Sequence, residues 1–121
     1  MSKDLDNIFS LNNRVIVITG AVGLLGRMHA EAVAAFGGIP VLLDIKLSEL
    51  NEFEAEINAK YNIESVSYVV DITDEDQVKK NASDVVDKFG CIDGLVNNAA
   101  NNPKVEDSSE KNFPRLENFP L

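Results

Sequence analysis

Four short apolar runs alternate with three longer segments of helical spacing between residues 14 and 97, and this alternation restricts the fold more than any other feature. The runs are RVIVIT (14–19), IPVLLD (39–44), SVSYVVD (65–71) and DGLVN (93–97). β-Branched, largely apolar runs of this length are typical of parallel strands that are covered on both faces. Because crossovers between parallel strands are right-handed, the alternation predicts an α/β fold with a doubly wound parallel sheet in the strand order 3-2-1-4.

The segments between the runs predict three helices. The first spans residues 24–36 and ends at a pair of glycines. The second carries Ser48 as its expected N-cap. Its apolar stripe consists of Leu50, Phe53, Ile57 and Tyr61. The third is expected to have Thr73 as N-cap and Asp76 at N3, and to end before Gly90. Its inward-facing side chains are predicted to be Val78, Ala82, Val85, Val86 and Phe89.

The composition limits the partners that such a domain can have. With 121 residues, of which 45% are apolar, the chain is long enough for one domain with a core. Its formal charge of -9 disfavours nucleic acids and anionic membrane surfaces, which it would repel. No apolar leader or membrane span is recognised, and a single cysteine cannot form an internal disulfide, so a cytoplasmic location is expected. That cysteine, Cys91, is expected to be a small apolar filler beside a strand.

The stretch TGAVGLLG, residues 19–26, follows the first apolar run and opens the first predicted helix. In that setting Gly20 permits a tight turn, Gly23 lets the backbone approach a pyrophosphate, and Gly26 lets the helix pack closely on the sheet. The free N–H groups at the helix start would form the anion site. A phosphate-binding P-loop is excluded because Arg27 follows Gly26. For this motif alone, a glycine-rich turn without a ligand is the simpler alternative.

An acidic residue, Asp44, ends the second apolar run, 24 positions after Gly20. A carboxylate in this place accepts hydrogen bonds from the hydroxyl groups of an adenosine ribose. It would repel the 2′-phosphate of NADP, so Asp44 favours NAD, although the nearby cation of Lys46 could blunt this preference. Taken alone, Asp44 could be only a helix-capping aspartate. Its coincidence with the glycines is what points to a dinucleotide.

With these motifs the chain resembles the short-chain dehydrogenases/reductases, which have a Rossmann-type fold, over about residues 11–100. The resemblance rests on TGAVGLLG, Asp44, DIT (71–73) and above all DGLVNNAA (93–100), which is similar to the NNAG element of the family. The middle glycine of TGAVGLLG comes one residue earlier than in the common form of the family, as in its extended members. NNAA, in contrast, resembles the common form.

The resemblance implies a set of cofactor-binding residues. At the pyrophosphate and ribose these are Gly20, Ala21, Val22, Gly23 and Leu25, and Gly26 belongs to the same set. Asp71 and Ile72 are implied to flank the adenine, and Asn98 and Ala99 to lie against the ribose. Asn97 is implied to tie the fourth strand to its neighbours.

The chemistry of the family requires a tyrosine, a lysine four residues later and an upstream serine, and this sequence offers no such pattern. Ser65 stands four residues after Tyr61, and Ile72 stands four residues after Tyr68. No catalytic residue is therefore assigned. The chain resembles an incomplete half of an NAD-dependent enzyme that acts on an alcohol or carbonyl substrate, and the complete protein would by this resemblance be a homo-oligomer.

Residues 1–100 are expected to form the dinucleotide-binding portion, and residues 101–121 an irregular tail. The tail has no periodicity and contains Pro103, Pro114 and Pro120, so it is interpreted as a loop that is cut short. It also resembles the corresponding loop of short-chain oxidoreductases associated with the biosynthesis of surface or flagellar acidic sugars. This second resemblance suggests a sugar derivative as the substrate.

Other functional classes fit parts of the sequence. A non-catalytic dinucleotide-binding module would share the same motifs. A receiver-like signalling domain would use Asp71 as phosphate acceptor, but it would need acidic residues where Thr19 and Gly20 stand. No metal site is expected, because the acidic run DITDED (71–76) lacks the spacing of a calcium loop and His29 has no neighbouring co-ligand.

Overall fold

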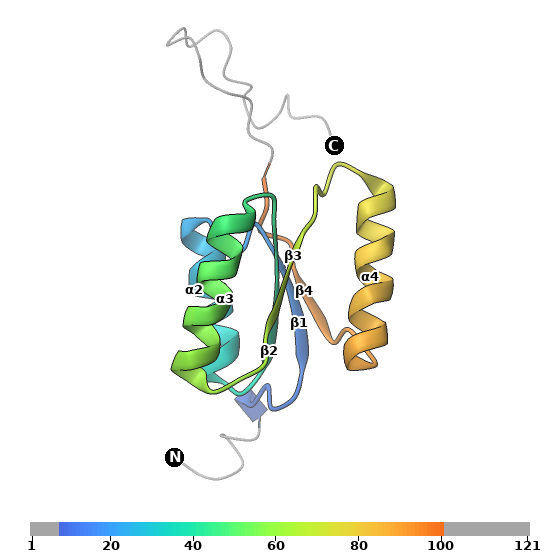
Figure 1. Cartoon of the computed structure of the whole chain (residues 1–121). Coiled ribbons are helices and arrows are strands. Elements are labelled where there is room, and N and C mark those ends of the chain that lie inside the picture. Colours follow the sequence, from blue (N-terminus) through green and yellow to red (C-terminus); the bar gives the residue numbers. More distant parts are fainter. Residues whose placement is uncertain (1–7, 101–121) are drawn as a thin grey trace, which may run out of the picture.

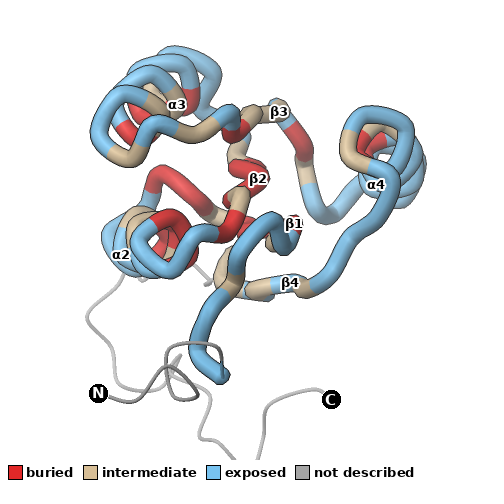
Figure 2. The backbone as a smooth tube through the Cα atoms, turned by 90° about the horizontal axis from the view of Figure 1, so that it is seen from below, coloured by how far each residue is buried: buried red, intermediate tan, exposed pale blue. Residues whose placement is uncertain are grey.

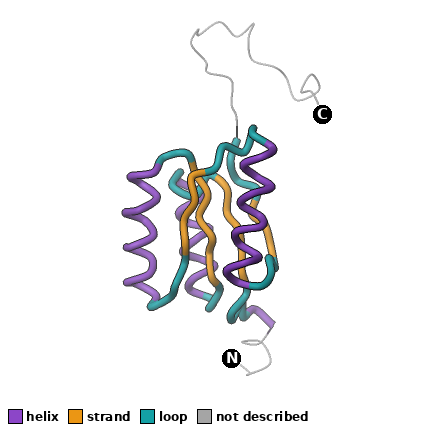
Figure 3. Tube along the Cα trace, turned by 45° about the vertical axis from the view of Figure 1, so that its right-hand side comes forward, coloured by secondary structure: helices purple, strands orange, loops and turns teal. Residues whose placement is uncertain are grey.

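The computed structural model describes residues 8–100, which form a four-stranded parallel sheet between two layers of helices (Figure 1). The elements, in chain order, are β1 Val15–Thr19, α2 Leu24–Ala35, β2 Ile39–Asp44, α3 Leu47–Tyr61, β3 Val66–Val69, α4 Glu75–Phe89 and β4 Gly94–Val96. Helices α2 and α3 cover one face of the sheet and α4 covers the other (Figures 1 and 3). None of the described helices is long and apolar enough to span a bilayer. The tail predicted for residues 101–121 lies outside the described residues.

The strand order is β3-β2-β1-β4, which confirms the order predicted from the sequence. β1 pairs in parallel with both β2 and β4. After β3 the chain returns across the opposite face through α4 and adds β4 on the far side of β1. The strand order therefore reverses between β1 and β4, and the carboxyl edge beside this pair is the switch point at which doubly wound sheets bind ligands.

Side chains that alternate along the central strands build a core on each face of the sheet. Ile18 and Leu42 pack with Phe53 of α3 in the core beneath α2 and α3. Val17 and Val41 belong to the second core, under α4. Figure 2 shows the buried strand residues gathered in the central strands β1 and β2, with further buried residues on the helix faces that line the sheet. This two-sided burial explains why the central strands lack polar alternation.

The two outer strands are shorter than their apolar runs predict. β3 covers 66–69 of the predicted 65–71, and β4 covers 94–96 of the predicted 93–97. Each lies at an edge of the described sheet, so β3 pairs only with residues 41–44 of β2 and β4 only with residues 16–18 of β1. The polar last residues of the two runs, Asp71 and Asn97, consequently lie in the connections at the carboxyl edge, whereas Ser65 and Asp93 precede their strands.

Helix α3 begins earlier than the sequence predicts. Its first residue is Leu47, and its N-cap is Lys46, which makes no side-chain capping bond. Ser48 therefore lies inside the first turn, and the prediction that it caps the helix is wrong. The buried residues of the helix are Leu50, Phe53 and Ile57, as the stripe predicts.

Helix α4 is capped by Asp74 and not by Thr73. The Asp74 carboxylate accepts hydrogen bonds from the N–H groups of the second and third helical residues, at 3.0 and 3.3 Å. The Thr73 hydroxyl is already engaged, because it donates to the carboxylate of Asp71 at 2.6 Å. The predicted cap is wrong by one residue for this reason.

The buried stripe of α4 also differs from the prediction. Val85 is buried and Phe89 is partly buried, as expected. The predicted inward residues that are instead exposed are Val78, Ala82 and Val86. One turn before Val85 the buried position is taken by Asn81, which is only 6% exposed. Residues 81, 85 and 89 share one stripe at a spacing of four, and the three exposed residues form the stripe beside it.

Replacing Asn81 by leucine is expected to stabilise the fold. The Nδ2 atom of Asn81 is buried and has no hydrogen-bond partner within residues 8–100. An unpaired buried donor costs about 1–3 kcal/mol, so Asn81→Leu should raise the free energy of unfolding by about 1–2 kcal/mol in urea titrations followed by circular dichroism. The control is Asn51→Leu at an exposed position of α3, with an expected change within about 0.5 kcal/mol. A less stable Asn81→Leu protein would show that the amide is satisfied.

Asp93 joins the start of β4 to the start of β1. Its carboxylate accepts a hydrogen bond from the N–H of Val15 at 2.7 Å, and this bond above all holds the pKa of Asp93 below its usual value.

Cys91 is exposed, so the prediction that it fills space beside a strand is wrong. Local desolvation and the nearby Asp93 carboxylate raise the pKa of the Cys91 thiol, which disfavours the reactive thiolate.

Candidate functional site

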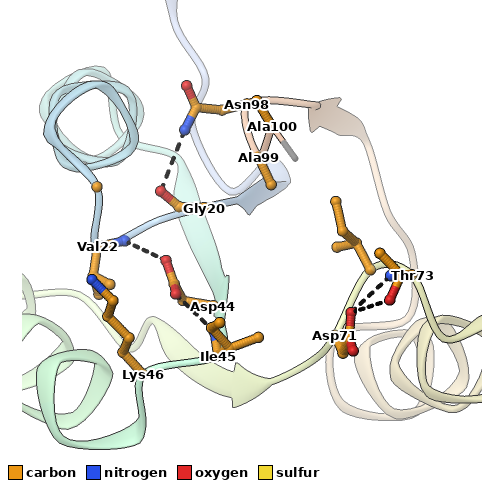
Figure 4. Close-up of a pocket in the computed structure, with 12 residues that line it drawn as sticks. Gly20, Val22, Asp44, Ile45, Lys46, Asp71, Thr73, Asn98, Ala99 and Ala100 are labelled. Atoms are coloured by element: carbon orange, nitrogen blue, oxygen red, sulfur yellow. Dashed lines mark hydrogen bonds between the residues drawn. The ribbon is translucent and has the colours of Figure 1, made fainter. Parts of the chain in front are cut away.

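A pocket lies at the carboxyl edge of the sheet and is lined by residues that follow all four strands (Figure 4). The lining consists of Gly20, Val22 and Gly23 together with residues 44–46, 71–73 and 98–100. The cavity volume is about 560 Å³, within the range of small-molecule sites. Segments separated by up to 80 positions in the sequence thus meet in one concave surface.

Most of the predicted site residues line this pocket. They are Gly20, Val22, Gly23, Asp44, Asp71, Ile72, Asn98 and Ala99. Three others do not line it. Ala21 is buried and its N–H donates to the carbonyl of Leu43 at 3.0 Å, while the side chain of Leu25 is exposed. Gly26 is buried against the backbone of the preceding turn.

Four further residues line the pocket that the motif analysis did not assign to it. They are Ile45, Lys46, Thr73 and Ala100. Ile45, Thr73 and Ala100 are direct neighbours in sequence of assigned residues, and Lys46 lies two positions after Asp44, so the position of the motifs at the strand ends was the available signal.

The turn after β1 is held tightly against the end of β4. Gly20 has a positive φ of 63°, and a Cβ atom there would lie 3.1 Å from the Cα of Ala99 and from the Nδ2 of Asn98. The same Nδ2 atom donates to the carbonyl oxygen of Gly20 at 3.3 Å (Figure 4). The position therefore favours glycine both for its conformation and for the close approach of two backbone segments.

Thr19 supports the pocket from the end of β1, a role that was not predicted from the sequence. Its hydroxyl oxygen accepts hydrogen bonds from the N–H groups of Asn98 and Ala99, at 3.0 and 2.9 Å. A hydroxyl side chain at the last position of β1 thus fixes the first two pocket residues after β4. Asn97, which was expected to tie β4 to its neighbours, is exposed and forms no side-chain hydrogen bond within the described residues, so Thr19 and Asn98 make that connection.

The N-terminus of α2 borders the pocket through Gly23. Its N-cap is Gly23, which has no side chain and provides no capping bond. The N–H groups of the first helical turn have no intrahelical acceptor, and the helix dipole is positive there. Helix α4 contrasts with it, because Asp74 satisfies the corresponding groups. The α2 terminus can therefore bind an anion such as a pyrophosphate.

The carboxylate of Asp44 is oriented by two backbone N–H groups (Figure 4). Oδ2 accepts from Val22 at 3.2 Å, and Oδ1 accepts from Ile45 at 2.7 Å. Each carboxylate oxygen keeps lone pairs for further donors. This arrangement suits the two hydroxyl groups of a ribose, which would donate to it.

A second carboxylate, Asp71, lies across the pocket from Asp44 (Figure 4). It accepts hydrogen bonds from the hydroxyl and the N–H of Thr73, at 2.6 and 2.9 Å. These two bonds lower the pKa of Asp71, which favours its ionised form. The carboxylate can then accept a hydrogen bond from a ligand, for example from the amino group of an adenine. Within residues 8–100 there is no cluster of three or more side chains suited to a metal ion.

These features fit a dinucleotide: an uncapped helix start, a glycine turn without side chains, and one carboxylate on each side. A family model for the short chain dehydrogenases matches residues 14–118 of the chain. The chain belongs to the short-chain dehydrogenase/reductase family. Its described residues form the nucleotide-binding region of this oxidoreductase family, and this confirms the resemblance seen in the motifs.

Individual short-chain dehydrogenases are similar to the chain at moderate identity. The 15-hydroxyprostaglandin dehydrogenase [NAD(+)] of Macaca fascicularis is 32% identical over 106 residues, which cover 87% of this chain and 38% of the relative. The post-translational flagellin modification protein A of Campylobacter coli is 28% identical over 89 residues, or 74% of this chain and 35% of the relative. The chain thus spans little more than a third of the length of these relatives.

Solved structures of the family show the same fold. NAD+-bound xylitol dehydrogenase is 36% identical, with a TM-score of 0.70 over 75% of this chain and 35% of that one. NADPH-dependent 3-quinuclidinone reductase from Rhodotorula rubra is 29% identical, with a TM-score of 0.72 over 78% of this chain and 36% of that one. Both nicotinamide cofactors therefore occur among the structural relatives.

Proposed function

We propose that the chain binds NAD in the pocket at the carboxyl edge, as the nucleotide-binding part of an enzyme that transfers a hydride between nicotinamide and an alcohol or carbonyl. The observation that carries the proposal is the Asp44 carboxylate, which lines the pocket and is fixed by two backbone N–H groups. A carboxylate at this place favours two ribose hydroxyls and disfavours a 2′-phosphate.

Each part of the cofactor has a matching group in the pocket. The pyrophosphate would lie at the uncapped start of α2 next to Gly23, and the adenosine ribose at Asp44. The adenine would lie beside Asp71 and Ile72, and the second ribose near Asn98. When bound, the nicotinamide ring supplies the hydride acceptor or donor, and this chain contributes binding and orientation.

A sugar derivative is the substrate class that we propose for the complete protein. Two observations support it: the resemblance of residues 101–121 to the loop of oxidoreductases of acidic-sugar biosynthesis, and the similarity to a flagellin modification protein. The proposal includes a cytoplasmic location and a homo-oligomeric complete enzyme, as the family resemblance implies.

The 121-residue chain by itself is expected to bind NAD without turning it over. No tyrosine in the sequence is followed four residues later by a lysine, so the general acid/base of the family chemistry is missing. Calorimetric titration with NAD should give saturable binding that ADP-ribose competes away, and an assay at 340 nm with alcohols and sugars should show no reduction. Absence of NAD binding would contradict the binding proposal. Reduction that rises in proportion to the chain concentration would contradict the expected inactivity.

A further inference from the structure

Arg27 is placed where a positive charge has no obvious reason to be. It is the fourth residue of α2, close to the positive end of the helix dipole, which is unfavourable for a cation. Within residues 8–100 no carboxylate oxygen lies within 4 Å of its guanidinium group. Its Nε–H instead donates to the carbonyl oxygen of Val22 at 2.9 Å.

The guanidinium group of Arg27 packs on an aromatic ring of the core. Its central carbon lies 4.8 Å from the ring centre of Phe53 in α3, in the geometry of a cation–π contact. Phe53 is only 3% exposed and packs in the core under α2 and α3, so its ring is surrounded by core side chains. Arg27 therefore contacts a core side chain, Phe53, and the backbone of the glycine turn at the same time.

Val22 connects this contact to the pocket. Its carbonyl is held by Arg27, and its N–H donates to the Asp44 carboxylate at 3.2 Å. The N–H of Gly23, which belongs to the same peptide unit as the Val22 carbonyl, donates to Gly20 at 3.1 Å. The Val22–Gly23 peptide is thus fixed at both ends, and Arg27 supplies one of the two fixing bonds.

We propose that Arg27 is a positioning residue for cofactor specificity: clamped between Phe53 and the Val22 carbonyl, it holds the Val22 N–H in line with Asp44 and so fixes the carboxylate that discriminates between NAD and NADP. The inference rests on the proposed NAD binding at Asp44. Arg27 itself does not line the pocket, so it acts through Val22 and not by touching the nucleotide.

The test is the ratio of the dissociation constants for NADP and NAD, measured on the full chain at fixed ionic strength. We expect Arg27→Met to lower this ratio by about fivefold, the size of one lost hydrogen bond. A direct charge effect would have the opposite sign, because removal of a cation near the site would weaken NADP more than NAD. The matched control is Arg14→Met, which removes an exposed arginine from an ion pair with Asp93 and should leave the ratio unchanged.

A double-mutant cycle separates positioning from general loss of stability. In the Asp44→Asn background, Arg27→Met should leave the ratio unchanged, since the group through which it acts is gone. Hydrogen exchange should also show faster exchange of the Val22 amide in Arg27→Met at unchanged exchange of the β2 core. If Arg27→Met does not yield folded protein, Arg27→Lys, which keeps the charge but loses the planar group over Phe53, should shift the ratio in the same direction.

The outcomes distinguish this inference from the function on which it rests. Failure of the parent chain to bind either nucleotide would overturn the proposed function, and the specificity role with it. NAD preference in the parent, with an unchanged or increased ratio in folded Arg27 variants, would overturn the role of Arg27 alone. An equal effect of Arg27→Met in both backgrounds would likewise show that it does not act through Asp44.

Discussion

Alanine in place of Gly26 is expected to destabilise the fold by about 3 kcal/mol or more, a large fraction of the stability of a small domain. A Cβ atom at this position would overlap the carbonyl oxygen of Gly20 and would lie 2.8 Å from the Cα of Ala21. Both contacts are with backbone, so no side-chain rotation can relieve them. The Gly20 carbonyl cannot move freely, because it accepts hydrogen bonds from the N–H of Gly23 and the amide of Asn98.

The measurement is the free energy of unfolding in urea, with NAD binding as a second readout. Gly94→Ala is the matched control: among residues 8–100 its Cβ would come close to the flexible end of the Ile16 side chain, at 3.0 Å, and to no backbone atom, so the expected cost is below about 1 kcal/mol. Nucleotide binding should be lost with Gly26→Ala, because the start of α2 can no longer approach the turn. Equal urea midpoints for Gly26→Ala and the parent would show that α2 is not packed as described.

Asparagine in place of Asp44 is expected to reduce the preference for NAD over NADP by at least about tenfold. Two unit charges about 4 Å apart near a protein surface repel by up to about 4 kcal/mol, and one third of that is about tenfold in affinity. The Asp44 carboxylate is held toward the pocket by the N–H groups of Val22 and Ile45, so it cannot simply turn away from a 2′-phosphate. Asparagine keeps the size of the side chain and removes the charge.

Replacement of Lys46 is expected to change the cofactor preference in the opposite direction to replacement of Asp44. The ammonium group of Lys46 lies 3.9 Å from a carboxylate oxygen of Glu49 and is well exposed, so it is only loosely held at the rim of the pocket. Lys46→Met should raise the NAD preference, since the cation is then unavailable to a 2′-phosphate. Titrations of parent and variants with both cofactors at one ionic strength give the ratios directly. An unchanged ratio of the dissociation constants for NADP and NAD in Asp44→Asn would show that Asp44 does not bind the ribose.

The features predicted best from the sequence are those that depend on neighbouring residues in the chain. The apolar runs predict the strands, and right-handed crossovers then favour the strand order 3-2-1-4. The structure has this strand order. Gly20 and Asp44 stand at strand ends, and the carboxyl ends of parallel strands meet at one edge, so their convergence on a single pocket follows from topology.

The predictions from the sequence are wrong where two neighbouring residues can both cap a helix, and where tertiary packing determines which face of a helix is buried. Thr73 and Asp74 are both good N-caps, and only the structure shows that Asp71 engages the Thr73 hydroxyl. On α4, apolar residues occupy two adjacent stripes, and the stripe that faces the sheet is the one that contains Asn81. Periodicity alone favours the more apolar stripe, so the orientation of α4 could not be predicted from it.

Amide chemical-shift mapping of the ¹⁵N-labelled chain during titration with NAD tests the central claim most directly. The account predicts saturable shifts confined to the pocket, above all at Val22, Gly23, Ile45 and Asn98, with weaker or absent shifts for NADP at the same concentrations. The exposed flank of α4, with Val78 and Val86, should be silent and serves as the internal reference. No shifts at millimolar NAD, or shifts gathered on α4 and away from the carboxyl edge, would contradict a nucleotide site in this pocket.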